Sequence, residues 1–376
     1  MVRRVRRKAP ARCGSGEKSE MISSETYLST FGVFPLAVAK HGIRPEWASE
    51  IEKAPISITK RHFPYMEHVG DVTQLHGGRL PPVDVLTFGS PCQNLSQIGN
   101  RDGLAGEQSG LFYEAIRIIN EMRCATDGQY PQLAIWENVA GAFSSAMGAD
   151  FRAVLEAFAD GEIPMPDSGK WAPAGLVPDG CPEIAWRLLD SQHFQSAQSR
   201  ERVFVIADYR GQRASQILFN PLPLHKILGD GEESGLPFPG AGGGGASQTG
   251  GNHAEVRCFH TRKMRGAVQY HDPKMFLSAI GKPGAPCPTL LTGDYQVIAV
   301  HFPDAPEKDY IRKLTVTEFE MLMGLPVGWT KFGHEGQHIS DSARFKALGN
   351  SIVLGCAEYI MALAASILQK QEDSDG

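Results

Sequence analysis

The residue of this chain whose setting most favours chemistry is Cys92. It follows an apolar run at residues 83–87, which predicts a buried strand, and it lies between Pro91 and Gln93. A free cysteine is usually buried and inert, so Cys92 could simply pack in a core. Here a proline fixes the backbone before it, and a polar, glycine-containing loop follows that can expose the sulfur. We therefore predict a nucleophile, which also needs a nearby acid, base or hydrogen-bond donor.

Two later stretches could supply those groups. Glu137 ends an apolar run, where a carboxylate is costly to bury unless it is hydrogen-bonded or used, although it could equally cap a helix. Gln198, Arg200 and Arg202 alternate, so on a strand their side chains share one face. Two arginines on one face suit recognition of phosphate or carbonyl groups. The alternative is a solvated surface strand.

Short apolar strands alternate with helical patterns from residue 21 to about 209. This alternation predicts an α/β fold with a mostly parallel, Rossmann-like sheet covered on both faces. The strands are expected at 83–90, 132–139, 183–190 and 202–208, and the helices at 109–122 and 150–160. Ligands bind such sheets at the carboxyl ends of the strands, where both Cys92 and Glu137 fall.

The alternation then stops and a second region begins. Residues 235–251 have the glycine-rich composition of a flexible linker. Residues 252–310 are irregular and locally basic, and helical spacing of apolar residues returns in 312–329 and 347–368. We expect a disordered basic arm at 1–20 (or upstream sequence misassigned to the start), a large α/β domain at 21–209, a smaller irregular domain at 210–310, and a helical return at 311–370.

Composition narrows the class of protein. The chain has 376 residues, of which 42% are hydrophobic and 21% charged, as in ordinary globular proteins. Neither a membrane span nor a secretory signal peptide is expected. The seven cysteines are scattered without a CxxC pair, so we expect reduced thiols in a cytoplasm rather than disulfides or a zinc site. Because the net charge is -5, any binding of nucleic acid must use a local basic face.

Five stretches together resemble the cytosine-5 DNA methyltransferases of bacteria and phages. They are "PCQ" at 91–93, "ENV" at 137–139, "QSRER" at 198–202, "RKLTVTEFEMLMGLPVGW" at 312–329 and "ALGNSIV" at 347–353. Each short motif alone is weak evidence. Their order and the place of the variable segment agree with the family, and the resemblance covers nearly everything after residue 25.

The resemblance implies a catalytic domain at 21–209 that uses S-adenosylmethionine. Cys92 would add to carbon 6 of a cytosine that has been flipped out of double-stranded DNA. Glu137 would bind ring nitrogen 3 and the exocyclic amine, and Arg202 would bind the carbonyl, while Arg200 and Gln198 orient the site. Such an enzyme is expected to be a monomer in the cytoplasm, in some cases beside a restriction endonuclease that acts separately.

The start of the cofactor pocket departs from the family pattern. The family has a strand that ends in Phe-x-Gly-x-Gly-Gly, and here Phe31 and Gly32 match, but the turn is shorter and lacks further glycines. We expect this shortening to crowd the methionine end of the cofactor, because Val33 cannot adopt the positive φ that glycine permits.

The other cofactor positions match. The resemblance implies that Glu50 binds the ribose hydroxyls, that Ile51 packs on the adenine, and that Asp71 reads the adenine amine. Val72, Leu111, Asn350 and Ile352 are implied to line the same pocket. Taken singly, these residues could be surface acids at strand ends or an asparagine at a helix start.

DNA contacts are implied in two places. The loop after Cys92 matches a mobile loop that closes over DNA, with Gln93 and Ser96 among its contacts, and Gln198 is implied to contact DNA as well. Residues 210–310 match the target-recognition domain. Within it, one stretch holds four basic side chains and no acid, which suits phosphate contacts, although it could be a solvated loop: Arg257, Arg262, Lys263 and Arg265.

Two other functions fit part of the pattern. One branch of the family shares "PCQ" and "ENV" but modifies tRNA, and the long variable segment here favours DNA instead. The second is a catalytically impaired DNA-binding relic, which would keep the fold and lose the cofactor loop. The shortened turn at 31–34 supports that alternative.

Overall fold

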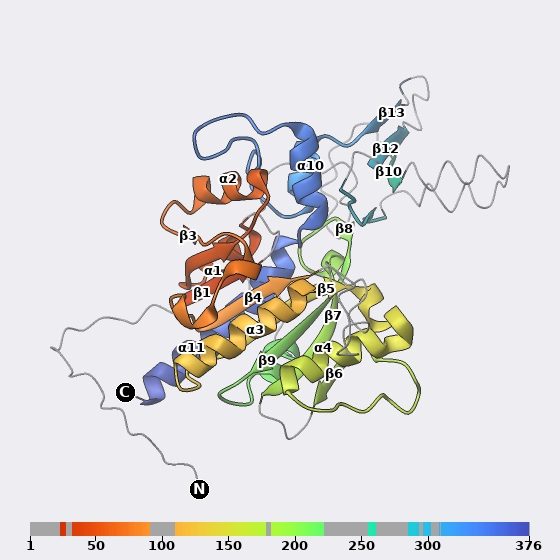
Figure 1. Cartoon of the computed structure of the whole chain (residues 1–376). Coiled ribbons are helices and arrows are strands. Elements are labelled where there is room, and N and C mark those ends of the chain that lie inside the picture. Colours follow the sequence, from red (N-terminus) through yellow and green to blue (C-terminus); the bar gives the residue numbers. More distant parts are fainter. Residues whose placement is uncertain are drawn as a thin grey trace, which may run out of the picture.

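The computed structural model describes residues 23–27, 32–90, 110–177, 182–221, 255–260, 285–292, 296–301, 308 and 310–375. Eight strands form the main sheet: β1 Ser23–Tyr27, β2 Arg44–Ser49, β3 Glu67–His68, β4 Val85–Gly89, β5 Leu133–Val139, β6 Ala174–Val177, β7 Glu183–Asp190 and β9 Glu201–Asp208. Their order is β3-β2-β1-β4-β5-β9-β7-β6 (Figure 1). Pairings from β3 to β5 are parallel, and those that join β9, β7 and β6 are antiparallel. The sheet is therefore mixed, and the predicted site residues Glu137 and Arg202 lie on β5 and β9, where the parallel part meets the antiparallel part.

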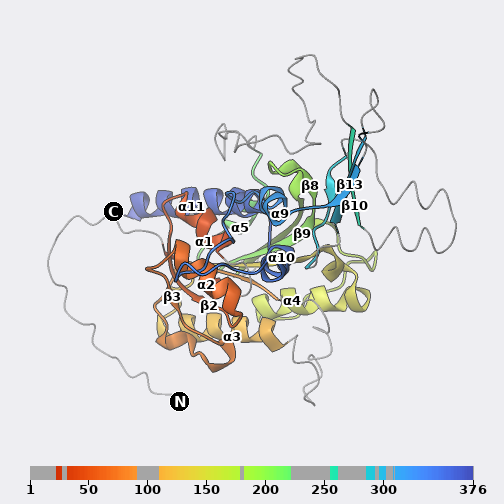
Figure 2. The ribbon, with the colours of Figure 1, turned by 90° about the horizontal axis from the view of Figure 1, so that it is seen from above.

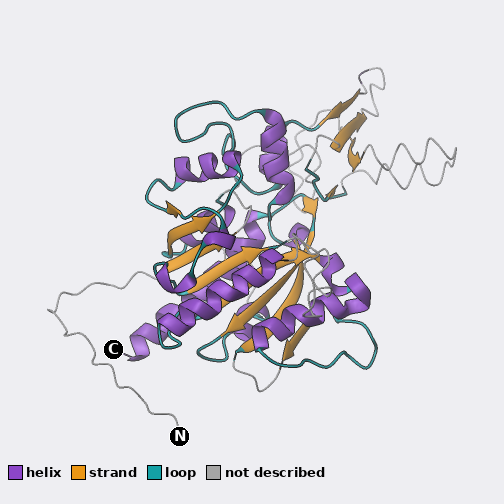
Figure 3. Ribbon diagram, viewed as in Figure 1, coloured by secondary structure: helices purple, strands orange, loops and turns teal. Residues whose placement is uncertain are grey.

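Helices cover both faces of the sheet, as the alternating pattern predicted (Figures 2 and 3). One face holds α1 (Val33–Ala39) and α11 (Leu354–Asp375), and the other holds α3 (Gly110–Ala125) and α4 (Ala149–Ala159). In β5, Leu133 and Ile135 belong to the first core, and Ala134 and Trp136 belong to the second. Because successive strand side chains point to opposite faces, a strand buried on both sides is apolar throughout.

The helical pattern at 347–368 is interrupted. α10 (Asp341–Asn350) ends before Ser351, and α11 begins at Leu354. The carbonyls of Gly349 and Ser351 accept hydrogen bonds from Arg200 rather than from a continuing helix. Among the described residues no single helix has the length and apolar composition to cross a membrane, and only α10 and α11 together, bent by 48°, meet that test.

Four further segments of the chain are helical. They are α2 (Lys53–His62), α5 (Ala214–Leu218), α9 (Val316–Leu322) and the 3-10 helix η1 (Val72–Gln74). α9 begins with a capping box between Thr315 and Glu318. α5 packs on β7, so the large domain continues past the boundary expected at residue 209.

A smaller antiparallel sheet lies to one side of the large one (Figure 1). It has the order β10-β12-β13, formed by β10 (Glu255–His260), β12 (Gln296–His301) and β13 (Tyr310–Lys313). The region was expected to be irregular, and β13 crosses the boundary expected at residue 310. A short parallel pair, β8 (Gln198–Ser199) with β11 (Cys287–Pro288), joins this region to the site-bearing strands.

The expectation that all cysteines are reduced is wrong for one pair. Cys258 on β10 and Cys287 on β11 are joined in a disulfide, with Cα atoms 5.1 Å apart, whereas Cys124 and Cys356 are free. That Cα separation lies in the usual range for a disulfide. The two residues are 29 positions apart. Tertiary contact between β10 and β11 brings the two cysteines together, so their spacing in the sequence does not predict the disulfide.

Candidate active site

The centre of the site is an ion pair between Glu137 and Arg202. Glu137 lies on β5 and Arg202 on its antiparallel neighbour β9, and Nε of Arg202 is 2.9 Å from Oε1 of Glu137. Only 13% of the Glu137 side chain and 14% of the Arg202 side chain are exposed. Gly89, at the end of β4, is the register partner of Glu137. A Cβ at Gly89 would lie 3.3 Å from Oε2, so glycine leaves the carboxylate its room.

The electrostatics of this pair favour a carboxyl group that holds its proton. Burial raises the pKa of Glu137, and the positive charges of Arg202 and Arg200 oppose that rise without cancelling it. Among the described groups, Oε1 receives no well-aligned hydrogen bond despite the ion pair. A buried carboxyl group with a raised pKa can both donate to and accept from a ligand.

β5 also fixes the backbone that leads to the predicted nucleophile. The indole Nε1 of Trp136 donates to Ser90 Oγ at 3.0 Å, and Asn138 Nδ2 donates to the carbonyl of Ser90 at 2.7 Å. Trp136 and Asn138 flank Glu137, so one strand end carries the carboxylate and anchors the end of β4. Sequence reasoning missed both anchors, although Asn138 stands in the "ENV" motif. Cys92 itself, with Gln93 and Ser96, lies outside the described residues.

Arg200 is a buried cation that binds backbone carbonyls. Its guanidinium donates to Leu290 O at 2.8 Å, Gly349 O at 2.8 Å and Ser351 O at 2.6 Å. Burial, and then repulsion from Arg202, lowers the pKa of Arg200 to about 9. Arg200 thus joins the β8–β9 turn to the 285–292 segment and to the junction between α10 and α11.

Gln198 has a similar position. It was expected among the DNA-contacting residues, but it is fully buried, and its Oε1 accepts from Leu290 N–H at 2.7 Å. Its amide also lies 3.5 Å from Leu322 O. Of the three alternating side chains, therefore, Arg202 reaches Glu137, whereas Arg200 and Gln198 hold surrounding backbone.

Gly32 begins the edge where the cofactor was expected. It precedes α1 with φ 92°, and a Cβ there would lie 3.2 Å from the Phe63 ring, so this position needs glycine. Val33 is the first residue of α1, is fully buried and does not have a positive φ, and the expected crowding of the methionine end of the cofactor stays a prediction. Phe31 lies outside the described residues.

Glu50 and Asp71 follow the neighbouring strands β2 and β3. Oε1 of Glu50 accepts from the N–H groups of Ile51 at 2.8 Å and Glu52 at 2.9 Å. Ile51 is 66% exposed, an apolar side chain left bare beside a carboxylate. Asp71 is exposed and caps η1 through Thr73 N–H at 3.0 Å.

Two contacts link neighbouring segments at this edge. Ser49 Oγ donates to Gly70 O at 2.6 Å, which ties the loop after β2 to the loop after β3. Lys346 on α10 binds Glu52 at 2.9 Å, which brings the helix ending at Asn350 to the same loop. Asn350 is exposed, and three apolar members of the predicted set lie in or against the cores: Val72, Leu111 and Ile352.

These residues fit an adenosine-bearing cofactor. Two carboxylates can accept from hydroxyl and amine groups, and the exposed Ile51 can cover an apolar ring face. All follow the carboxyl ends of parallel strands, where open α/β sheets bind ligands. Among the residues with described positions, no group of three or more His, Cys, Asp or Glu side chains could hold a metal ion.

One of the predicted recognition residues is described. Arg257 lies on β10 opposite Ala299 of β12 and is half-buried. Arg262, Lys263 and Arg265 lie outside the described residues.

Comparison with known sequences gives consistent matches. The model of the family described as "C-5 cytosine-specific DNA methylase" matches residues 27–227. The chain is 33% identical over 197 residues to the "DNA N-6-adenine-methyltransferase" of Escherichia phage P1, covering 45% of this chain and 26% of that protein. It is 25% identical over 188 residues to the Bacillus subtilis "Type II methyltransferase M.BsuFI", covering 48% and 39%. The chain thus spans well under two thirds of these relatives.

Solved structures share the fold. A DNA modification methyltransferase encoded within an E. coli prophage is 18% identical with a TM-score of 0.53, covering 92% of this chain and 99% of that one. The S. pombe Dnmt2 methyltransferase is 14% identical with a TM-score of 0.56, covering 93% and 99%. These likenesses show a methyltransferase fold with a mixed central sheet and a separate smaller domain.

Proposed function

Because the chain belongs to the C-5 cytosine-specific DNA methylase family, we propose that it is a DNA (cytosine-5-)-methyltransferase. It transfers a methyl group from S-adenosylmethionine to carbon 5 of a cytosine flipped out of DNA. The observation that carries this proposal is the buried ion pair of Glu137 and Arg202 at the end of β5, beside the strand end that leads to Cys92.

The proposed chemistry begins when the Cys92 thiolate, whose proton has been lost, adds to carbon 6 of the cytosine and breaks the π bond between carbons 5 and 6. Protonated Glu137 donates to ring nitrogen 3 and accepts from the exocyclic amine, and Arg202 donates to the ring carbonyl. These contacts stabilise the electron density that the new bond pushes into the ring. Carbon 5 then becomes nucleophilic.

The bound cofactor supplies the methyl group. The residues that would hold it are Glu50, Ile51 and Asp71, at the carboxyl ends of β2 and β3, with Gly32 and Asn350 beside them. After methylation, loss of the carbon 5 proton re-forms the ring double bond as the Cys92 sulfur leaves. Flipping the base costs a few kcal/mol, which the closing loop and the recognition domain must offset.

The recognition of sequence is assigned to residues 210–310 together with the small sheet of β10, β12 and β13, whose last strand ends at Lys313. The named type II relatives support a role in restriction-modification, with an endonuclease, where one exists, acting separately. A monomer in the cytoplasm suits an enzyme that modifies DNA in bacterial or phage hosts.

Identifying the methylated nucleoside tests this proposal. The protein is incubated with methyl-labelled S-adenosylmethionine and either double-stranded DNA or tRNA, and the products are digested and separated. Label in 5-methyldeoxycytidine is expected. Label in N6-methyldeoxyadenosine, which the name of the phage P1 relative makes a necessary comparison, would overturn the assignment, as would label confined to tRNA.

A further inference from the structure

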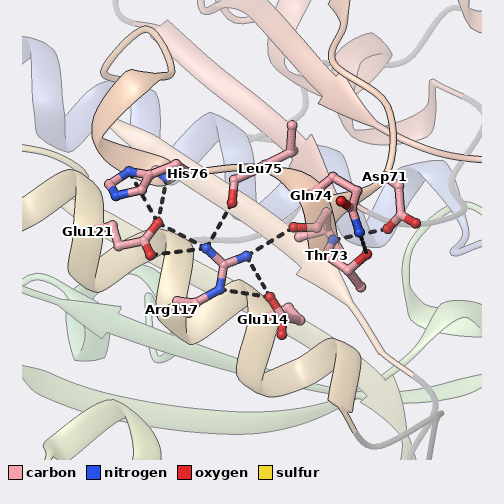
Figure 4. Close-up of polar contacts among 10 residues, drawn as sticks. Asp71, Thr73, Gln74, Leu75, His76, Glu114, Arg117 and Glu121 are labelled. Carbon is pink, nitrogen blue, oxygen red and sulfur yellow. Dashed lines mark hydrogen bonds and ion pairs between the residues drawn. The ribbon is translucent and has the colours of Figure 1, made fainter.

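Arg117 on α3 donates hydrogen bonds to the backbone of the segment that follows β3 (Figure 4). Its Nη2 donates to Val72 O at 3.0 Å, and its Nη1 donates to Leu75 O at 2.8 Å. These carbonyls lie at the first residue of η1 and at the residue that ends it. One guanidinium therefore fixes both ends of η1, which lies 42 to 45 residues earlier in the chain.

Two carboxylates on the same helix orient this guanidinium. Glu114 accepts from Nε at 2.7 Å and from Nη2 at 2.5 Å, and Glu121 accepts from Nη1 at 3.0 Å (Figure 4). Glu121 also accepts from Gly77 N–H at 2.7 Å. Hydrogen bonds from Gly77 and Arg117 outweigh the effect of burial and lower the pKa of Glu121. The forked geometry of arginine suits several simultaneous acceptors, which a lysine could not reach.

The backbone of this segment rests directly on α3. A Cβ at Gly77 would lie 2.2 Å from the carbonyl oxygen of Ile118, so only glycine permits the contact. The Asp71 carboxylate caps η1 through Thr73 N–H, and its position therefore follows that of η1. Because α3 also carries Leu111, one helix bears both a side chain that the resemblance assigns to the cofactor pocket and the arginine that holds η1.

We propose that Arg117 is a positioning residue of the cofactor site, which sets Asp71 and Val72 relative to Leu111 and so determines affinity for the adenosine part of S-adenosylmethionine. This inference rests on the proposed function. Arg117 acts through Asp71 and η1, because its hydrogen bonds go to Val72 O, Leu75 O and two carboxylates of its own helix.

The test uses calorimetry with S-adenosylmethionine on the full chain. Arg117→Gln should weaken binding about tenfold, the size expected for lost hydrogen bonds of a charged group. Arg117→Lys should restore part of it. The KM for S-adenosylmethionine should rise more than kcat falls, and DNA affinity in gel shifts should stay unchanged. Arg123→Gln is the matched control, because Arg123 lies on the same helix and donates to Pro131 O at 2.9 Å, away from η1.

A double-mutant cycle distinguishes positioning from general stabilisation. If Arg117 acts through Asp71, Asp71→Ala should cost less affinity in the Arg117→Gln protein than in the wild type. Additive effects, or an equal loss in Arg123→Gln, would overturn the inference. If Arg117→Gln does not fold, the same cycle is run with Arg117→Lys. A wild-type protein that binds no S-adenosylmethionine would instead overturn the proposed function itself.

Discussion

Glu137 is the residue in which burial, charge and geometry most clearly combine. It is held beside Arg202 at 2.9 Å, and its own strand anchors Ser90 on β4 through Trp136 and Asn138. A buried carboxyl group normally costs stability unless neighbours compensate. Here the compensation is partial, because burial leaves the pKa of Glu137 above its ordinary value. This raised pKa favours the protonated carboxyl group that the proposed contact with a ring nitrogen requires.

The first prediction concerns the pH dependence of turnover. Because burial raises the pKa of Glu137, its proton persists to a higher pH than in an exposed glutamate. The contribution of protonated Glu137 to the stability of the folded protein is fully present below the ordinary pKa of glutamate. It is lost as the pH rises through the raised pKa of Glu137 in the folded protein. Single-turnover methylation should lose its Glu137-dependent contribution over the same window.

Variants check this assignment. Glu137→Gln should slow methyl transfer by about two orders of magnitude, as removal of one stabilising group typically does, and should remove that limb of the pH profile. Glu183→Gln is the control, because Glu183 is another buried glutamate of the same sheet, bonded to Ser215 at 2.7 Å. An unchanged pH profile in Glu137→Gln would count against the proton-donor role.

At the scale of elements, Arg200 holds three separate segments together through hydrogen bonds. It connects the β8–β9 turn, the 285–292 segment and the junction between α10 and α11 through three backbone carbonyls. Two of those carbonyls, Gly349 O and Ser351 O, lie where α10 ends and accept from Arg200 rather than from a continuing helix. These segments are held together because one planar guanidinium donates hydrogen bonds to backbone carbonyls in each of them.

The second prediction is that Arg200→Leu destabilises the protein by about 3 kcal/mol or more, since it leaves several buried carbonyls without donors. Arg200→Lys should recover little, because an ammonium group lacks the fork. Arg152→Lys is the control, as its exposed pairing with Glu156 should contribute at most about 0.5 kcal/mol. Denaturant unfolding measures the free energy of unfolding of all three variants. Equal losses of stability for the Arg200 and Arg152 variants would contradict this role of Arg200.

Elements with a strong local period could be predicted from the sequence. β4, β5, β7 and β9 and helices α3 and α4 lie close to their expected bounds, because each is apolar with a regular spacing. The Cys258–Cys287 disulfide and the hydrogen bonds of Arg117 to η1 could not be predicted. The two cysteines are brought together only by tertiary contact. Arg117 binds backbone carbonyls, which every residue has, so the sequence does not indicate which ones it binds.

The motif residues divide in the same way. Glu137 and Arg202 form an ion pair that the motifs did not predict, whereas Gln198, which was expected to contact DNA, is buried. The sequence marks which residues the family shares, but burial decides which of them can reach a ligand.

At the scale of the whole molecule, a methyltransferase sheet is combined with a small sheet set to one side (Figure 1). With a net charge of -5, the chain as a whole does not attract DNA. The proposed DNA binding therefore needs local basic side chains for its phosphate contacts, and residues 257–265 hold four basic side chains and no acid.

The third prediction concerns the salt dependence of DNA binding. Neutralising Arg262 and Lys263 together should lower the slope of log affinity against log salt by about two, because each lost phosphate contact releases one counterion fewer. Neutralising Arg152 and Lys170, exposed residues of the large domain, should leave the slope unchanged. If both pairs behave alike, the recognition surface lies elsewhere.

The measurement that tests the central claim most directly is covalent trapping on duplex DNA containing 5-fluorocytosine. Fluorine at carbon 5 blocks the elimination step, so the sulfur of Cys92 should remain bonded to carbon 6 once the methyl group has been transferred. With S-adenosylmethionine present, we predict a denaturation-resistant protein–DNA adduct whose mass maps to the peptide containing Cys92. The adduct should be absent for Cys92→Ser, which should still bind DNA. A wild-type protein that methylates DNA yet forms no such adduct, or one whose adduct maps to another residue, would contradict the account.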